Sequence, residues 1–176
     1  MIDPFYQSVL YVAFGLYLML LATAAGCDLW KFIIPNVVSI ALVLLFVATA
    51  LLLPFEVAWL SHIGAALACF AVGALFFAFG WMGAGDVKLL TALALWTGFQ
   101  PLPQLLLYVC LAGGAFALFM ILLRKVVMSL VMLQSSGGSV ALPRILLVGE
   151  KIPYGVALTF GGIMVAFDLP HLGLYL

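Results

Sequence analysis

The sequence predicts an all-α fold, a polytopic membrane helix bundle with about six transmembrane helices. Hydrophobic residues make up 68% of the 176 residues, and charged residues make up only 7%. Soluble domains carry about 25% charged residues, so twelve charged side chains cannot cover a surface that faces water. Long apolar runs separated by charged or Gly/Pro-containing segments are the second observation. We expect one membrane-embedded domain over residues 1–176.

The first three helices are expected at residues 5–26, 35–53 and 58–79. Each run is apolar and has about the 20 residues that a helix needs to cross roughly 30 Å of hydrocarbon. The first run is longer than the apolar core of a signal peptide and no Lys or Arg precedes it, so we expect it to be retained. The second helix is expected to begin at Pro35.

The next three helices are expected at residues 85–99, 105–123 and 154–171. The fourth run has a predicted rise of only about 22 Å before a proline-containing break, which is less than a full span. Either the bilayer thins there, or the preceding glycine loop dips below the membrane surface beside a hydrated pocket.

The segment from residue 126 to residue 151 contains Gly, Ser and Pro residues that interrupt its apolar pattern. It is interpreted as a cytoplasmic loop with possible interfacial helices.

The basic residues predict the orientation of the bundle. With the amino terminus outside, every Lys and Arg falls on the cytoplasmic side, as the positive-inside rule requires: Lys31, Lys88, Arg124, Lys125, Arg144 and Lys151. The formal net charge is zero and the sequence has no basic tract, so nucleic acid is not an expected partner. The lipid bilayer is the expected surrounding.

Asp28 and Asp86 are the candidate catalytic residues. Both are expected at the cytoplasmic edge of the membrane, where an ionisable side chain is costly and therefore marks a candidate functional site. Each also has a structural interpretation: Asp28 can pair with Lys31, and Asp86 can cap the fourth helix. Two carboxyl groups around one water can act as base and acid on a peptide bond, which requires no metal or other cofactor.

The residues around these aspartates form three motifs in order. Asp28 is followed by Ile34-Pro35-Asn36, then by Gly83-Ala-Gly85-Asp86-Val-Lys88, then by Ile152-Pro153-Tyr-Gly155. In this order the motifs resemble the type IV prepilin peptidases of the Gly-x-Gly-Asp intramembrane aspartyl protease class. The resemblance extends over nearly the whole chain and is closest to the short, peptidase-only form associated with Flp or Tad pili.

The resemblance implies an endopeptidase that removes the basic leader of prepilins at the cytoplasmic face of the bacterial inner membrane. Asp28 and Asp86 then correspond to the catalytic pair. Substrate-binding or supporting roles are implied for Gly83, Gly85, Lys88, Lys31, Pro35, Asn36, Pro153 and Gly155. Methylation of the new pilin amino terminus is not expected, because the chain has no counterpart of the additional cytoplasmic domain of larger members.

Several interpretations stay open from the residues alone. Gly83 and Gly85 can simply form a turn, and Pro153 with Gly155 can simply start and pack a helix. At the level of the whole protein, the alternatives are a small ion or proton transporter, in which the aspartates relay charge, and a non-catalytic pilus-assembly protein. A transporter is expected to show acids near the middle of the bilayer and an internal repeat, and the sequence shows no evident repeat.

Overall fold

The computed structural model describes residues 3–53, 56–134 and 153–168. All regular secondary structure in these residues is helical, in the order α1 (Pro4–Lys31), α2 (Asn36–Leu52), α3 (Trp59–Ala78), α4 (Ala84–Thr97), α5 (Leu102–Gln134) and α6 (Gly155–Asp168). Helices α1 and α3 and most of α5 are long and apolar enough to cross a membrane, and α2 and α6 are shorter apolar helices. The predicted all-α membrane helix bundle is confirmed.

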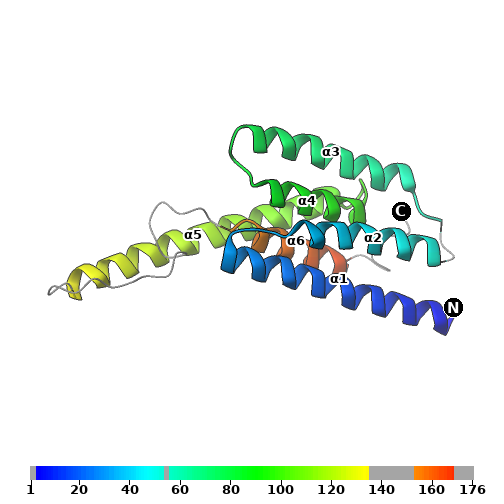
Figure 1. The fold of residues 1–176 in the computed structure, drawn as a ribbon, viewed down its shortest axis with the longest axis horizontal. Helices are drawn as coiled ribbons and strands as arrows, with labels where there is room; N and C mark the ends of the chain where they lie inside the picture. Colours follow the sequence, from blue (N-terminus) through cyan, green and yellow to red (C-terminus); the bar gives the residue numbers. More distant parts are fainter. Residues whose placement is uncertain (1–2, 54–55, 135–152, 169–176) are drawn as a thin grey trace.

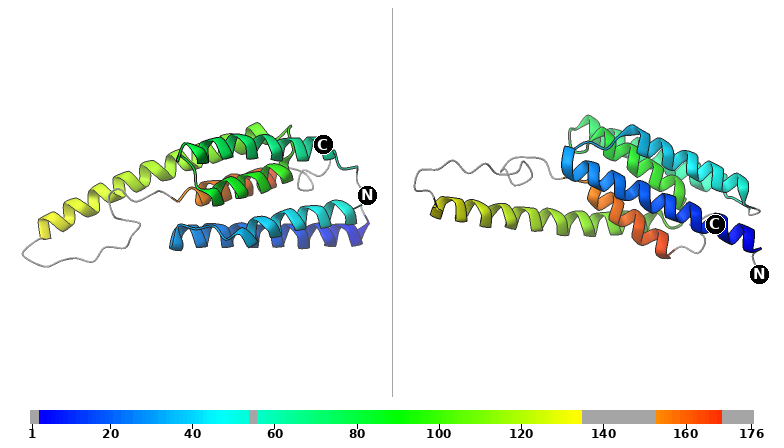
Figure 2. Two further views of the ribbon diagram at one scale, coloured as in Figure 1. Left: turned by 45° about the horizontal axis from the view of Figure 1, so that its top comes forward. Right: turned by 60° about the horizontal axis from the view of Figure 1, so that its bottom comes forward.

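Helix α4 lies inside the bundle. It packs against α2, α3, α5 and α6, while α1 packs against α2 and α6 (Figures 1 and 2). Val87, Leu89, Leu93 and Trp96 are among its buried side chains. The 14 residues of α4 rise about 21 Å, and neighbouring helices cover it on several sides. Such a helix does not need to match the full thickness of the hydrocarbon, because other helices rather than lipid surround much of it.

Two side chains fix α4 to its neighbours through backbone carbonyl groups. Trp96 Nε1 donates a hydrogen bond of 3.0 Å to the carbonyl oxygen of Leu42 in α2. His62 Nδ1 in α3 lies 2.8 Å from the carbonyl oxygen of Leu95, and because a carbonyl only accepts, Nδ1 carries the proton. Interhelical hydrogen bonds in membrane proteins contribute about 0.6 kcal/mol each to stability on average, so these two bonds add a modest stabilisation to the packing of α4.

The first helix ends later than the sequence predicted. The prediction ended it at Gly26 and placed Asp28 beyond it, whereas α1 continues to Lys31 and Asp28 lies in its last turn. Phe32 then takes a left-handed conformation with φ of 54°, and its N–H bonds to the carbonyl oxygen of Asp28 at 2.9 Å. The helix continues through Gly26 because an isolated glycine weakens a helix by only about 1 kcal/mol relative to alanine.

The fifth helix also extends beyond its predicted end. The chain from Val126 to Gln134 is helical and continues α5, where the sequence predicted the start of a loop. This stretch contains no Gly or Pro, so nothing in it interrupts the helix that precedes it. Most of the predicted loop, residues 135–151, lies outside the described residues, and so do the ends of several other segments, including residues 169–171.

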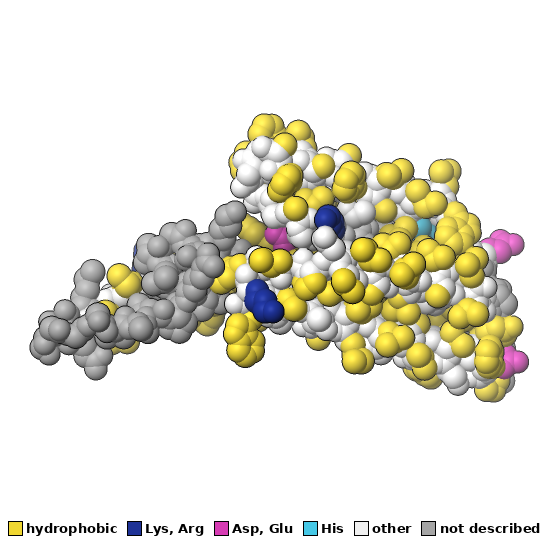
Figure 3. Space-filling model, in the orientation of Figure 1, with side chains coloured by type: hydrophobic (Ala, Val, Ile, Leu, Met, Phe, Trp, Pro, Cys, Tyr) yellow, Lys and Arg dark blue, Asp and Glu magenta, His cyan; other side chains and the backbone are white. Residues whose placement is uncertain are grey.

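The few described charges separate toward the two ends of the bundle. Asp3, Glu56 and Asp168 lie where α1 begins, α2 connects to α3, and α6 ends. Lys31 and Lys88 lie at the other end, in the last turn of α1 and the first turns of α4. On the face in Figure 3, hydrophobic side chains predominate between the two groups. Arg144, Glu150 and Lys151 fall outside the described residues.

Candidate active site

The three sequence motifs meet at one end of the bundle. Because successive helices run in opposite directions, the end of α1 and the starts of α2, α4 and α6 lie together at the end from which α5 extends (Figures 1 and 2). The helices therefore collect residues that are more than a hundred positions apart in the chain.

Asp28 is buried and anchored to the start of α6. Its side chain is 5% exposed. Its Oδ2 accepts a hydrogen bond of 2.7 Å from the backbone N–H of Gly155, the first residue of α6. A helix N-terminus has unpaired N–H groups and a positive dipole end, so it is a favourable partner for a carboxylate. The anchor holds one oxygen in place and leaves the other oxygen of the carboxyl group for another partner.

Gly155 is required here by close packing. A Cβ on this residue would lie 2.7 Å from Asp28 Oδ2 and 2.8 Å from Ile34 Cδ1. No real side chain fits at these distances, so the hydrogen bond to Asp28 depends on glycine at this position. The close approach explains why α6 starts with glycine beside Asp28.

Asp86 lies in the first turn of α4 and is partly exposed. Its Oδ2 accepts a hydrogen bond of 3.2 Å from the backbone N–H of Gly83, which precedes the helix. The carboxyl group therefore caps its own helix, as the structural interpretation of the sequence expected. This cap engages one oxygen of a carboxyl group that solvent can also reach.

Ile34 connects the two aspartate-bearing segments. This side chain is 5% exposed and lies against Gly155 on one side. On another side, a Cβ added to Gly85 would lie 3.1 Å from Ile34 Cβ and 3.4 Å from its carbonyl oxygen. The backbone next to Asp86 thus packs on the same residue as the α6 start that holds Asp28.

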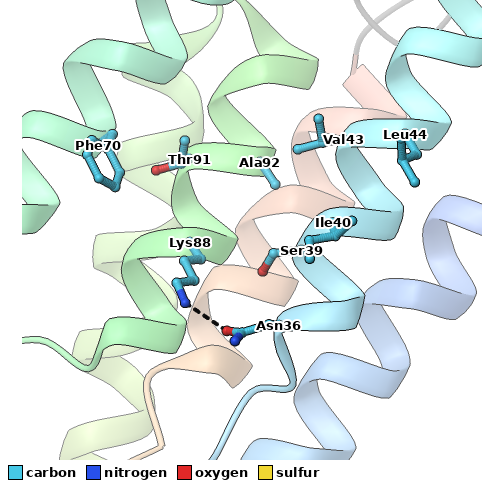
Figure 4. A pocket seen from close by; sticks show the side chains of 9 residues that line it. All are labelled: Asn36, Ser39, Ile40, Val43, Leu44, Phe70, Lys88, Thr91 and Ala92. Carbon is cyan, nitrogen blue, oxygen red and sulfur yellow. Dashed lines mark hydrogen bonds between the residues drawn. The ribbon is translucent and has the colours of Figure 1, made fainter.

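Lys88 and Asn36 form the third feature of this end. Lys88 Nζ donates a hydrogen bond of 2.9 Å to Asn36 Oδ1, which joins α4 to the start of α2 (Figure 4). Both side chains are exposed. The structure therefore brings together two predicted supporting residues that are 52 positions apart.

Three other predicted supporting residues, Lys31, Pro35 and Pro153, lie at the same end of the bundle. Their positions, rather than specific hydrogen bonds, relate them to the site. Lys31 is exposed at the end of α1, where a cation complements the helix dipole. Pro35 is the N-cap of α2, and Pro153 is buried just before α6.

The chemistry available at this end is that of carboxyl groups, a backbone N–H and an ammonium group. Carboxyl groups in the right protonation states can take a proton from water and give one to a carbonyl oxygen. Within the described residues, no group of three or more His, Cys, Asp or Glu side chains is arranged to hold a metal ion.

A comparison with protein families decides the assignment. The model of the type IV leader peptidase family matches residues 15–118. The chain belongs to this family. Searches against curated proteins and against solved structures found no match.

Two of the three sequence motifs lie inside the region that the family model matches. Residues 15–118 include Asp28 with the start of α2, and the glycine loop with Asp86. The family assignment identifies the chain as a leader peptidase-like protease of the membrane. Gly155 lies beyond the matched region, so its link to this site comes from its hydrogen bond to Asp28.

Three further residues near this end of the bundle were not singled out as site residues from the sequence. Ile34 was part of a motif, but its packing against two glycines depends on tertiary structure. Thr159 is buried and donates hydrogen bonds to the carbonyl oxygens of Gly155 at 2.7 Å and Leu21 at 3.4 Å, which ties the start of α6 to α1. Ser39 is buried in α2, about one helical turn beyond Asn36.

Proposed function

We propose that this chain is an intramembrane aspartyl endopeptidase that removes the basic leader peptide of prepilins. The observation that carries the proposal is the packing around Ile34, which joins the anchored carboxyl group of Asp28 to the backbone beside Asp86. The chain belongs to a family of leader peptidases, and this membership supports a catalytic role for the two carboxyl groups.

In the proposed mechanism the two aspartates act on one water molecule. One carboxylate takes a proton from the water while the oxygen of that water bonds to the scissile carbonyl carbon. The other aspartate, in its protonated form, gives its proton to the carbonyl oxygen. The aspartate that took the water proton then gives it to the departing amine as the carbon–nitrogen bond breaks. The other aspartate takes back a proton from the intermediate as its carbonyl group reforms. Like charges disfavour ionisation of both carboxyl groups at once, which provides the one protonated partner that the scheme needs.

The proposed location is the cytoplasmic face of the bacterial inner membrane, with the amino terminus outside. The separation of described charges supports this orientation, since Lys31 and Lys88 lie at the end with both aspartates. The acidic Asp3, Glu56 and Asp168 lie at the opposite end. Leader removal in a pilus system of the Flp or Tad type is the form of this activity that the three motifs, taken in order, resemble.

The proposal is tested by replacing each aspartate with its uncharged amide. Asp28→Asn and Asp86→Asn should each reduce prepilin cleavage at least a thousandfold, because an amide can neither accept the water proton nor donate an acidic one. The assay is cleavage of purified prepilin in detergent, followed by amino-terminal sequencing of the product.

Asp168→Asn is the matched control. Asp168 accepts hydrogen bonds from Tyr108 at 2.6 Å and Gln104 at 2.8 Å, at the other end of the bundle. Cleavage by this variant should stay within twofold of the wild type, because the substitution leaves the proposed catalytic carboxyl groups untouched. Cleavage that survives Asp28→Asn or Asp86→Asn contradicts the mechanism, and so does cleavage that EDTA abolishes and zinc restores.

A further inference from the structure

Two open grooves of nearly equal size lie on the helix bundle. One has a volume of about 380 Å³ and is lined by α2, α3 and α4; we call it the α2–α4 groove (Figure 4). The other has a volume of about 370 Å³ and is lined by α1 and α2; we call it the α1–α2 groove. Both volumes are in the range of about 300–1,000 Å³ that is typical of ligand pockets. Size therefore does not distinguish the grooves, whereas their position and polar groups do.

The α2–α4 groove begins beside the candidate active site. Its lining includes Lys88, which follows Asp86 by two residues in the first turns of α4, and Asn36, the first residue of α2. From this pair the groove continues along α2 and α4, past Val43 and Thr91 (Figure 4). A chain that entered the site at Asp86 would find this groove as a direct continuation.

Ser39 provides an unused polar group inside the α2–α4 groove. The residue is 6% exposed, and its Oγ has no hydrogen-bond partner among the described residues. Figure 4 shows the hydroxyl directed into the groove, toward the Lys88–Asn36 hydrogen bond. Buried hydroxyl groups in proteins are nearly always paired, and an unpaired one costs about 1–3 kcal/mol. The lining of the groove therefore contains one buried hydroxyl group whose hydrogen-bonding capacity is unused among the described residues.

We infer that the α2–α4 groove binds the apolar segment of the substrate that follows the leader, and that Ser39, Asn36 and Lys88 bind its unwound backbone next to the scissile bond. The inference rests on the proposed function. A protease can attack a peptide bond only where the substrate helix is opened, and opened backbone at the membrane has C=O and N–H groups that lipid cannot satisfy. The polar end of the groove supplies partners for these groups, and its apolar remainder accepts the intact helix.

The α1–α2 groove lacks both features. Its hydroxyl groups are already used, since Ser8 Oγ donates to the carbonyl oxygen of Pro4 at 3.0 Å and Thr49 Oγ1 donates to that of Leu45 at 2.7 Å. Its lining residues belong to the first half of α1 and the second half of α2, at the end of the bundle away from both aspartates. It is therefore a suitable internal control.

Photocrosslinking in membranes tests where the substrate lies. The photoreactive p-benzoylphenylalanine replaces Leu44 in the α2–α4 groove, or Val12 in the α1–α2 groove, and both native side chains are 63% exposed. The chain also carries Asp86→Asn so that full-length prepilin is retained. We expect prepilin adducts at position 44 at least fivefold more abundant than at position 12. Equal adducts, stronger adducts at position 12, lipid adducts alone at position 44, or no adduct at either position would overturn the inference.

Kinetics with Ser39→Ala test the polar end of the groove. The KM for full-length prepilin should rise about two- to tenfold, the value of one hydrogen bond, with kcat nearly unchanged. Ser8→Ala, the same change in the α1–α2 groove, should leave both parameters unchanged. A KM for Ser39→Ala equal to that of the wild type overturns the role of the hydroxyl. Failure of the wild-type chain to cleave prepilin would instead reject the proposed function, because the crosslinking readout does not depend on cleavage.

Discussion

The contact between Gly155 and Asp28 gives the sharpest prediction about the site. In Gly155→Ala, the new methyl group would lie 2.7 Å from Asp28 Oδ2 and 2.8 Å from Ile34 Cδ1. Ordinary contact begins at 3.4 Å, so the carboxyl oxygen and the α6 start must separate by about 0.7 Å. A separation of this size would lengthen the 2.7 Å hydrogen bond between the Gly155 N–H and Asp28 Oδ2 beyond the usual range of about 2.7–3.2 Å. It would also displace the carboxyl group that the proposed mechanism needs.

The expected magnitude follows from the two effects. Overpacking of a buried site costs about 1–3 kcal/mol of stability. A displacement of nearly 1 Å in a catalytic group can cost up to about a hundredfold in rate. We therefore expect Gly155→Ala to reduce prepilin cleavage about ten- to a hundredfold, with a clearly lower melting temperature in detergent.

Gly26→Ala is the control for this prediction. Gly26 lies two residues before Asp28 in the same helix, and a Cβ there would meet no atom within 4 Å. Alanine favours the helix by about 1 kcal/mol, so this variant should be as stable as the wild type or more so, and fully active. If Gly155→Ala matches Gly26→Ala in both cleavage rate and melting temperature, the described packing around Asp28 is wrong.

Two further predictions concern the bundle itself. Gly161→Ala should destabilise the α5–α6 contact by about 1–3 kcal/mol, because its methyl group would overlap Val109. In Gly114→Ala the methyl group meets nothing within 4 Å, so this variant should be as stable as the wild type or more so; thermal unfolding in detergent compares the two. Trp96→Phe removes the hydrogen bond to Leu42 but keeps an aromatic ring, and should cost about 0.5–1.5 kcal/mol by the same measurement. Equal stability of the two glycine variants, or a Trp96→Phe variant as stable as the wild type, would contradict the respective contact.

The sequence predicted those parts of the fold that depend on local composition. Apolar runs between charges gave the number of helices, and Pro35 and the glycines around residue 83 gave the starts of α2 and α4 within a residue or two. The end of α1 and the length of α5 were not predicted well, since Gly26 and the charges at residues 124 and 125 reduce apolar character without ending a helix. A change from apolar to polar residues indicates where a segment leaves the hydrocarbon. It does not indicate where the helix ends, because the helix can continue beyond the membrane.

The site could be predicted only as a set of residues. The motifs named Asp28, Asp86, Lys88 and Asn36, and the structure places all of them at one end of the bundle. The partner of Asp28 could not be predicted, because the donor is a backbone N–H that lies 127 residues away and carries no side-chain signal. Ser39 could not be predicted either, since a serine in an apolar helix is unremarkable until its surroundings are known.

The two aspartates share a structural principle that explains the glycines around them. Each carboxyl group lies at the N-terminus of a helix, Asp86 at that of its own α4 and Asp28 at that of the distant α6. A backbone N–H does not project from the main chain as a side-chain donor does, so the start of α6 must lie very close to Asp28. A side chain at Gly155 would prevent this close approach. The position of Asp28 therefore depends on how α6 is held along α1, by the hydrogen bond of 3.2 Å from Tyr17 to the carbonyl of Gly162 as well as by Thr159. A shift of α6 along α1 would therefore lengthen the hydrogen bond between the Gly155 N–H and Asp28 Oδ2 and change the position of the carboxyl group.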